Sequence, residues 1–285
     1  MREPRWSGTE PGASEAGQEP ALDVQVQVGL VRRLRGGRWG EAQEDPVAVE
    51  EPLEIRLEGL PAAITMRTPG HDLDLVAGFL LGEGVIDGPD DILAMAHVEE
   101  PSRPEGNTVD VRLSPGVPQA RRQRAQRERY ASSSCGVCGK ASIEALRLQA
   151  PPVSSQFELE PERLLALPAL LRQAQAAFAR TGGLHAAALV DGQGRIEVLR
   201  EDIGRHNAVD KVLGWRLRAE RLPVEDRLLL ISGRAGFEIV QKAWMAGVPA
   251  IAAVGAPSSL AVSLCREAGI KLYGFLRADG VNRYL

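Results

Sequence analysis

Cysteine is scarce in this chain of 285 residues, which contains three, at positions 135, 138 and 265. Three cysteines do not make a disulfide framework, so we expect a reducing compartment in which thiols react or bind metal. Long hydrophobic runs are also missing. No apolar stretch reaches the roughly 18 residues that span a bilayer, and the N-terminus lacks the apolar segment of a secretory signal. We therefore expect a cytoplasmic protein without a membrane anchor.

An excess of positive charge is likewise absent. The net charge is −4 and the isoelectric point is near 5.7, which argue against a general nucleic-acid binder. The exception is local, because residues 121–129 (RRQRAQRER) carry five arginines and one glutamate. This run is either a solvated loop or an electrostatic landing site for an anionic ligand or partner.

The first half of the chain divides by composition into three parts. Residues 1–22 are rich in Pro, Gly, Glu and Ser, which predicts a disordered tail. Residues 23–113 predict a small β-rich module, and residues 114–139 predict a mobile loop that contains the arginine run and two cysteines. Within the module we expect an alternating strand before a Gly36–Gly37 turn, strands over 53–60, 62–68 and 109–113, and a helix over 72–86.

Residues 140–285 alternate between short apolar runs and amphipathic stretches. The pattern predicts a strand hairpin over 186–191 and 195–201, further strands over 227–232, 249–255 and 271–276, and helices over 162–181 (kinked at Pro168), 207–220, 237–247 and 259–269. Several of these strands are almost continuously apolar, which is typical of a sheet buried on both sides. We therefore predict an α/β fold, with a mixed sheet covered by helices on both faces.

The sharpest local motif is CGVC, residues 135–138, in a loop rich in serine and glycine. Such a pair can hold zinc, but the sequence shows no second Cys/His pair at tight spacing. It can also form a redox dithiol, although no apolar strand leads directly into it. A third chemistry is sulfur carriage as a persulfide, for which nearby arginines and a following helix N-terminus favour the thiolate.

Polar residues gather where the predicted strands of the α/β region end. His185 precedes one strand, and a crowd of six (Glu201, Asp202, Arg205, His206, Asn207 and Asp210) surrounds Gly204 at the start of a helix. Capping explains one or two of the six, so we predict a site there, with Arg205 and free amides holding a phosphate. Ser232 and Arg234 follow the next strand, and Arg277 and Gly280 follow the last, where ligands of open α/β sheets bind.

Six motifs in order resemble the formate dehydrogenase accessory sulfurtransferase family, FdhD. They are RTPGHDLDLVAGFLLGEGVI, SSSCGVCGKASIEAL, TGGLHAAAL, REDIGRHNAVDKVLG, SGRAGFEIVQKAWMAGVPAIAAVGAPSSLAV and GFLRADGVNRY. The resemblance implies a cytidine-deaminase-like α/β domain and a cytoplasmic homodimer. It also implies delivery of sulfur from a cysteine desulfurase to the molybdenum bis-guanine-dinucleotide cofactor of formate dehydrogenase.

The resemblance also implies roles for particular residues. Cys135 would carry the persulfide with Cys138 as its partner, and the stretch Phe275, Leu276, Arg277, Ala278, Asp279 and Gly280 would contact the cofactor. Arg205, His206, Ser232 and Arg234 are the further candidates for holding the polyanionic cofactor, which is a bound substrate. We expect no metal held directly by the protein.

Two other functions compete with sulfur carriage. A zinc-dependent deaminase needs H-x-E followed downstream by P-C-x-x-C. Here His185 is followed by Ala186 and Ala187, and CGVC lies upstream, so this function is disfavoured. A non-catalytic cofactor chaperone stays open; it predicts that loss of Cys135 leaves function intact.

Overall fold

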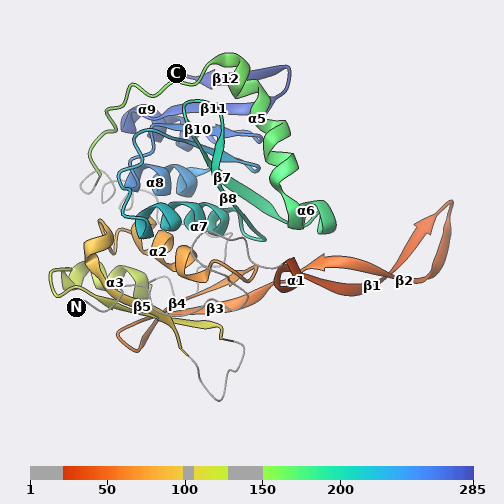
Figure 1. Ribbon diagram of the computed structural model, residues 1–285, viewed down its shortest axis with the longest axis horizontal. Helices are drawn as coiled ribbons and strands as arrows, with labels where there is room; N and C mark the ends of the chain where they lie inside the picture. The colour runs from red at the N-terminus through yellow and green to blue at the C-terminus, as the bar shows by residue number, and fades with distance from the viewer. Residues whose placement is uncertain (1–21, 99–105, 128–149) are drawn as a thin grey trace.

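The computed structural model describes residues 22–98, 106–127 and 150–285, arranged around three β-sheets (Figure 1). The predicted tail lies outside these residues, except for Leu22, which begins the short helix α1 (Leu22–Gln25). The CGVC motif also lies outside them. Among the described residues no helix is both long and apolar enough to cross a membrane.

The largest sheet has six strands in the order β12-β11-β10-β9-β7-β8. Its strands are β7 (His185–Val190), β8 (Ile196–Asp202), β9 (Leu228–Ile231), β10 (Ala250–Ala253), β11 (Lys271–Arg277) and β12 (Gly280–Tyr284). Strands β9, β10 and β11 are parallel, whereas β7, β8 and β12 join antiparallel, so the sheet is mixed as predicted. The predicted hairpin of β7 and β8 is confirmed.

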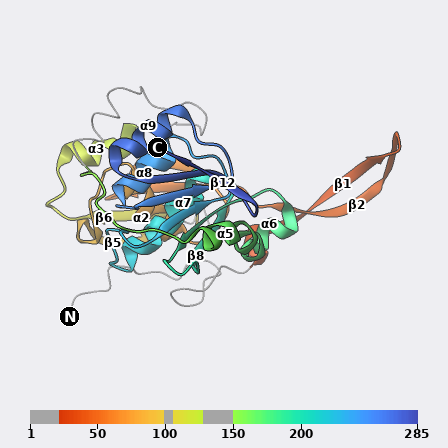
Figure 2. The ribbon, with the colours of Figure 1, turned by 90° about the horizontal axis from the view of Figure 1, so that it is seen from above.

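Helices cover both faces of this sheet, which confirms the predicted fold class (Figures 1 and 2). Helices α7 (Arg205–Arg218), α8 (Phe237–Met245) and α9 (Ser259–Ala268) pack on one face, and α5 (Pro161–Ala174) packs on the other. The alternating side chains of β9 show the division. Leu229 and Ile231 join the core beneath α7, α8 and α9, and Leu228 and Leu230 join the core beneath α5. Such burial on both sides explains why this strand lacks alternation.

The N-terminal part contributes a four-stranded sheet, ordered β4-β3-β6-β5, and one long helix. Its elements are β3 (Glu51–Leu57), β4 (Leu60–Arg67), α2 (Asp72–Gly82), β5 (Ile92–His97) and β6 (Thr108–Leu113). Helix α2 lies between this sheet and α7, so one apolar core runs from the small sheet to the large one. The sequence analysis missed β5, whose residues ILAMAH contain a single β-branched side chain.

Strands β1 (Val26–Arg35) and β2 (Arg38–Ala48) form a separate antiparallel hairpin, called the arm below. Its turn is Gly36–Gly37, as predicted, and both glycines have positive φ, which other residues adopt reluctantly. The arm extends well away from the rest of the molecule in both ribbon views (Figures 1 and 2).

The expected absence of regular structure in residues 114–139 is wrong for helix α3 (Gln119–Arg127). Alanine, glutamine and arginine are good helix formers, and the run contains little else. Arg121 pairs with Asp87 at 2.6 Å, and Arg122 pairs with Glu58 and donates to Ser114 O at 2.7 Å. These two arginines therefore hold α3 against the N-terminal sheet.

The predicted single helix over 162–181 is wrong, because α5 runs through Pro168 but ends at Ala174. The break comes at Gln175, after which α6 (Ala176–Thr181) begins. The Glu201 carboxylate accepts hydrogen bonds from the amides of Ala177 and Phe178, at 2.9 and 2.8 Å. A distant side chain thus caps α6 and sets the boundary, which no local pattern reveals.

A buried ion pair links α7 to α8. Lys242 Nζ lies 2.9 Å from Asp210 Oδ1 and 3.6 Å from Glu83, and both partners of the pair are almost fully buried. Burial raises the pKa of Asp210 to about 7 despite the nearby Lys242. Burial alone would lower the pKa of Lys242, but Asp210 and Glu83 outweigh it and raise that pKa, so Lys242 stays charged.

Lys242→Met is expected to lower the free energy of unfolding by about 3 kcal/mol at neutral pH, because Asp210 loses its counter-charge in the core. Without Lys242 the pKa of Asp210 in the folded state rises further above its unfolded value. The stability loss should therefore shrink as pH falls toward the unfolded pKa. Urea titrations at neutral and acidic pH measure it. Lys242→Met with Asp210→Asn should recover part of the loss; an equal loss in both variants would contradict this account.

Candidate functional site

The carboxyl ends of β9, β10 and β11 lie at one edge of the large sheet, together with the beginning of β7 and the end of β8. Helices α7, α8 and α9 each follow a strand at this edge, so their N-termini meet there. Free amides at helix N-termini attract anions. We call this the carboxyl edge.

Three loops of the carboxyl edge are joined by backbone hydrogen bonds. Gly255 N donates to Gly233 O at 2.9 Å, and Phe275 N donates to Gly255 O at 3.1 Å. A Cβ on Gly255 would lie 2.7 Å from Gly233 O, so glycine is needed for this close approach. The loops after β9 and β10 and the last residues of β11 thus form one continuous surface.

Arg205 and His206 begin α7, and both are half-buried at this edge. A Cβ on Gly233 would lie 3.8 Å from Arg205 Cδ and 3.5 Å from His185 Nδ1, so these two side chains flank the Gly233 backbone. The structure therefore brings His185 and Arg205, far apart in sequence, to the same loop.

The histidines of the edge are held neutral. Burial, followed by the charges of Lys242 and Arg205, lowers the pKa of His206 to about 3. His206 Nδ1 lies 3.1 Å from Glu238 Oε2 on the first turn of α8, a partner that the sequence analysis missed. Burial and then Arg205 likewise lower the pKa of His185. At neutral pH the positive charge of this edge therefore comes from arginines, and the histidines can only exchange hydrogen bonds.

Four of the six crowded polar residues around Gly204 hold the fold together. Glu201 caps α6, and Asp202 pairs with the fully buried Lys211 at 2.8 Å. Asn207 donates to Met66 O at 2.7 Å, and Asp210 pairs with Lys242. These four side chains are therefore engaged within the fold, and Arg205 and His206 are the members left at the edge.

The other candidates differ in what they offer a ligand. Arg234 is exposed beside Gly236, the N-cap of α8, where a Cβ would meet open space. The Ser232 hydroxyl instead accepts a hydrogen bond from Ala186 N at 2.9 Å, which ties β9 to β7. Arg234 is thus available to an anion, and the Ser232 hydroxyl, although it accepts from Ala186, still has its own proton to donate.

Residues Phe275–Gly280 do not follow the last strand, as the sequence analysis expected. Phe275 to Arg277 end β11, Ala278 and Asp279 form the hairpin turn, and Gly280 begins β12 and pairs with Arg277. Phe275 is 46% exposed with positive φ, whereas Leu276 is fully buried in the core. Arg277 donates to Val254 O at 2.6 Å and to Leu276 O at 2.8 Å. Ala278 and Asp279 are exposed at the tip. The turn residues are Ala278 and Asp279, and the Asp-Gly dipeptide that includes the second of them is the turn signal that could have revealed β12.

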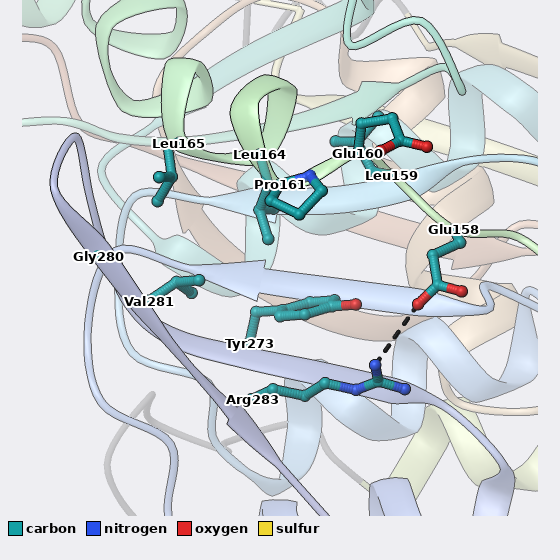
Figure 3. Close-up of a pocket in the computed structure, with 10 residues that line it drawn as sticks. All are labelled: Glu158, Leu159, Glu160, Pro161, Leu164, Leu165, Tyr273, Gly280, Val281 and Arg283. Atoms are coloured by element: carbon teal, nitrogen blue, oxygen red, sulfur yellow. Dashed lines mark hydrogen bonds and ion pairs between the residues drawn. The ribbon is translucent and has the colours of Figure 1, made fainter.

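A cavity of about 590 Å³ lies on the α5 side of the same hairpin (Figure 3). Leu159, Leu164 and Val281 line it beside Tyr273, and Glu158 and Arg283 pair at 3.4 Å. Glu160 adds a second carboxylate. This lining is apolar with acidic side chains, so it suits phosphate groups less well than the carboxyl edge does.

An α/β sheet whose carboxyl edge joins arginines to three helix N-termini has the features that attract anions. The chain belongs to the FdhD/NarQ family, whose model matches residues 48–285. It is 50% identical to a sulfur carrier protein FdhD of Mycobacterium tuberculosis, covering 84% of this chain and 90% of that one. It is also 50% identical to one from Streptomyces avermitilis, covering 89% and 92%.

The fold also matches a crystal structure from Desulfotalea psychrophila, described as that of a candidate formate dehydrogenase accessory protein. The TM-score is 0.71 over 91% of this chain and 96% of that one, at 24% sequence identity. At this identity the likeness supports the fold alone.

Proposed function

We propose that this chain is a sulfur carrier for the maturation of formate dehydrogenase. It accepts sulfur from a cysteine desulfurase on Cys135 and transfers it to the molybdenum bis-guanine-dinucleotide cofactor before that cofactor enters the enzyme. The proposal includes a cytoplasmic location and a homodimer. The family membership supports it, because the relatives named above are sulfur carrier proteins.

The observation that carries the proposal is the carboxyl edge. Arg205, Arg234 and Arg277 come from three different loops of one surface, into which the N-termini of α7, α8 and α9 point. The cofactor carries two pyrophosphate groups, and a protein of net charge −4 must bind them with local cations and oriented amides. This edge supplies both.

The chemistry takes two balanced steps. The Cys135 thiolate attacks the outer sulfur of the donor's persulfide, and the donor's cysteine leaves as a thiolate. The sulfur then departs from Cys135 as sulfide toward the molybdenum centre. The two electrons for this reduction come from the Cys138 thiol, which forms a disulfide with Cys135. The sulfide replaces an oxygen ligand of the molybdenum. That oxygen leaves as water, with one proton from the Cys138 thiol and one from the persulfide.

A direct test is to load the purified chain. Incubation with a cysteine desulfurase and L-cysteine should add about 32 Da, one sulfur atom, to the peptide that contains Cys135. Dithiothreitol should remove the added mass. If no donor adds this mass while the chain still binds guanosine diphosphate, the non-catalytic cofactor chaperone replaces the carrier.

Arg205→Ala is expected to weaken the binding of guanosine diphosphate, a mimic of one guanine-nucleotide portion of the cofactor, by about tenfold or more, because a charge-assisted contact to phosphate is lost. Isothermal titration calorimetry measures the affinity. Arg195→Ala is the matched control, since Arg195 pairs with Asp191 in the β7–β8 turn at the far end of the sheet. Equal affinities in the two variants would remove Arg205 from the site.

A further inference from the structure

The arm presents large apolar side chains to solvent. Its base packs on its own chain, where Val26 joins Ala177 and Leu184 in a small core. Beyond the base, Leu30 is 80% exposed, Val28 67%, Trp39 62% and Leu34 54%. An isolated two-stranded ribbon is marginally stable in water, so a ribbon of this length with an apolar surface calls for a partner.

These side chains lie on one face of the arm. The register pairs Val28 with Pro46, Leu30 with Glu44, Arg32 with Ala42 and Leu34 with Trp39. Because side chains alternate along β1, Val28, Leu30, Arg32 and Leu34 share a face, and their cross-strand partners lie on it with them; the register shifts between Arg32 and Leu34, but Leu34 stays paired with Trp39. We call this the apolar face of the arm. The opposite face carries Gln27, Gln43 and the ion pair of Arg33 and Asp45, together with Val31 and Val47.

We propose that the apolar face of the arm binds the same face of a second copy of this chain, antiparallel about a twofold axis. This inference rests on the homodimer proposed above and assigns its surface. The face is self-complementary when the axis lies between the Leu30 and Arg32 pairs. Arg32 then meets Glu44 of the second copy, and Val28 and Pro46 meet Leu34 and Trp39 of the second copy.

The remaining charges favour the same orientation. Arg32, Arg35 and Arg38 gather near the tip of the arm with one carboxylate, Glu41, whereas Glu44 lies nearer its base; Arg33 and Asp45 pair with each other. An antiparallel pairing sets each net positive tip beside Glu44 of the other arm. A parallel pairing would set the two net positive tips together, which like-charge repulsion disfavours.

Sedimentation velocity on the full chain tests this surface by charge exchange. Arg32→Glu and Glu44→Arg should each raise the dimer dissociation constant about tenfold or more, because each creates two like-charge contacts per dimer. The variant with both changes should recover the dimer, since the pair is restored with its signs exchanged. Leu30→Asp should give a monomer, and Gln43→Glu, on the opposite face, should leave the dimer unchanged.

Circular dichroism checks whether the single variants fold, and rescue by the double variant would separate a lost contact from a damaged arm. A monomeric wild type at micromolar concentration would overturn both the homodimer and this surface. A dimer that survives Arg32→Glu and Leu30→Asp would overturn the surface alone. Failure of Cys135 to take up sulfur, with the charge exchange behaving as expected, would refute sulfur carriage and leave this inference standing.

Discussion

Replacing Cys135 with alanine is expected to abolish sulfur loading of the chain while its affinity for guanosine diphosphate stays unchanged. The thiolate is the atom that attacks the donor's persulfide, so nothing replaces it when the sulfur atom is removed. Our proposal places nucleotide binding at the carboxyl edge, which contains no cysteine among its described residues. Mass spectrometry after incubation with a desulfurase and L-cysteine measures loading, and calorimetry measures affinity.

Cys265→Ala is the matched control for this experiment. Cys265 is buried in α9, and burial raises its pKa to about 12, so its thiol stays protonated and shielded at neutral pH. Loading should therefore survive its removal. A chaperone without sulfur chemistry predicts that Cys135→Ala still supports formate dehydrogenase maturation, and that result would contradict the carrier.

Cys138→Ala separates the two proposed steps. Because Cys138 supplies the electrons for release and not the attack on the donor, this variant should load sulfur on Cys135 but retain it. A variant that fails to load would give Cys138 a part in the first step instead.

The fold was predictable from the sequence wherever a helix or strand buries one or both of its faces, because its apolar residues then follow a regular pattern. The continuous apolar runs LLLI and AIAA predict strands β9 and β10. The helical spacing of apolar residues predicts α8 and α9. Elements bounded by distant side chains were not predictable. The end of α5 depends on Glu201, and the anchoring of α3 depends on Glu58 and Asp87.

The candidate site was predictable as a place but not residue by residue. Strand ends followed by glycines and arginines correctly located the carboxyl edge. Which polar side chains face a ligand depends on the positions of the buried cations. Lys211 pairs with Asp202, and Lys242 pairs with Asp210. The sequence pattern does not reveal these ion pairs. The role of the CGVC motif is still a prediction from the sequence, because its residues lie outside the described ranges.

Gly214→Ala is expected to lower the free energy of unfolding by about 4 kcal/mol or more, the range of a severe core mutation. A Cβ on Gly214 in α7 would lie 1.8 Å from Asp74 O and 2.6 Å from Gly78 N, both in the backbone of α2. A Cβ on Gly78 would in turn lie 1.9 Å from Asp210 O. The two helices therefore cross in backbone contact, and no rotamer change can relieve the clash.

Helix propensity predicts the opposite sign for this substitution, since alanine in a helix interior is favoured over glycine by about 1 kcal/mol. Urea denaturation of the full chain thus distinguishes the two effects by sign. Gly192→Ala, in the β7–β8 turn with open space around its Cβ position, should change stability little. A Gly214→Ala chain as stable as wild type would show that α2 and α7 do not meet this closely.

Gly214→Ala should also change the geometry of the carboxyl edge. Arg205 begins α7, and Gly214 lies on the same continuous helix, which moves as a rigid element at about 1.5 Å per residue. To admit a methyl group, α7 must move away from α2 and carry the Arg205 backbone with it. Any folded Gly214→Ala chain should therefore bind guanosine diphosphate more weakly, whereas Gly192→Ala should not. Unchanged affinity in folded Gly214→Ala would mean that the N-terminus of α7 is positioned by its loop contacts at Gly233 and not by the helix crossing.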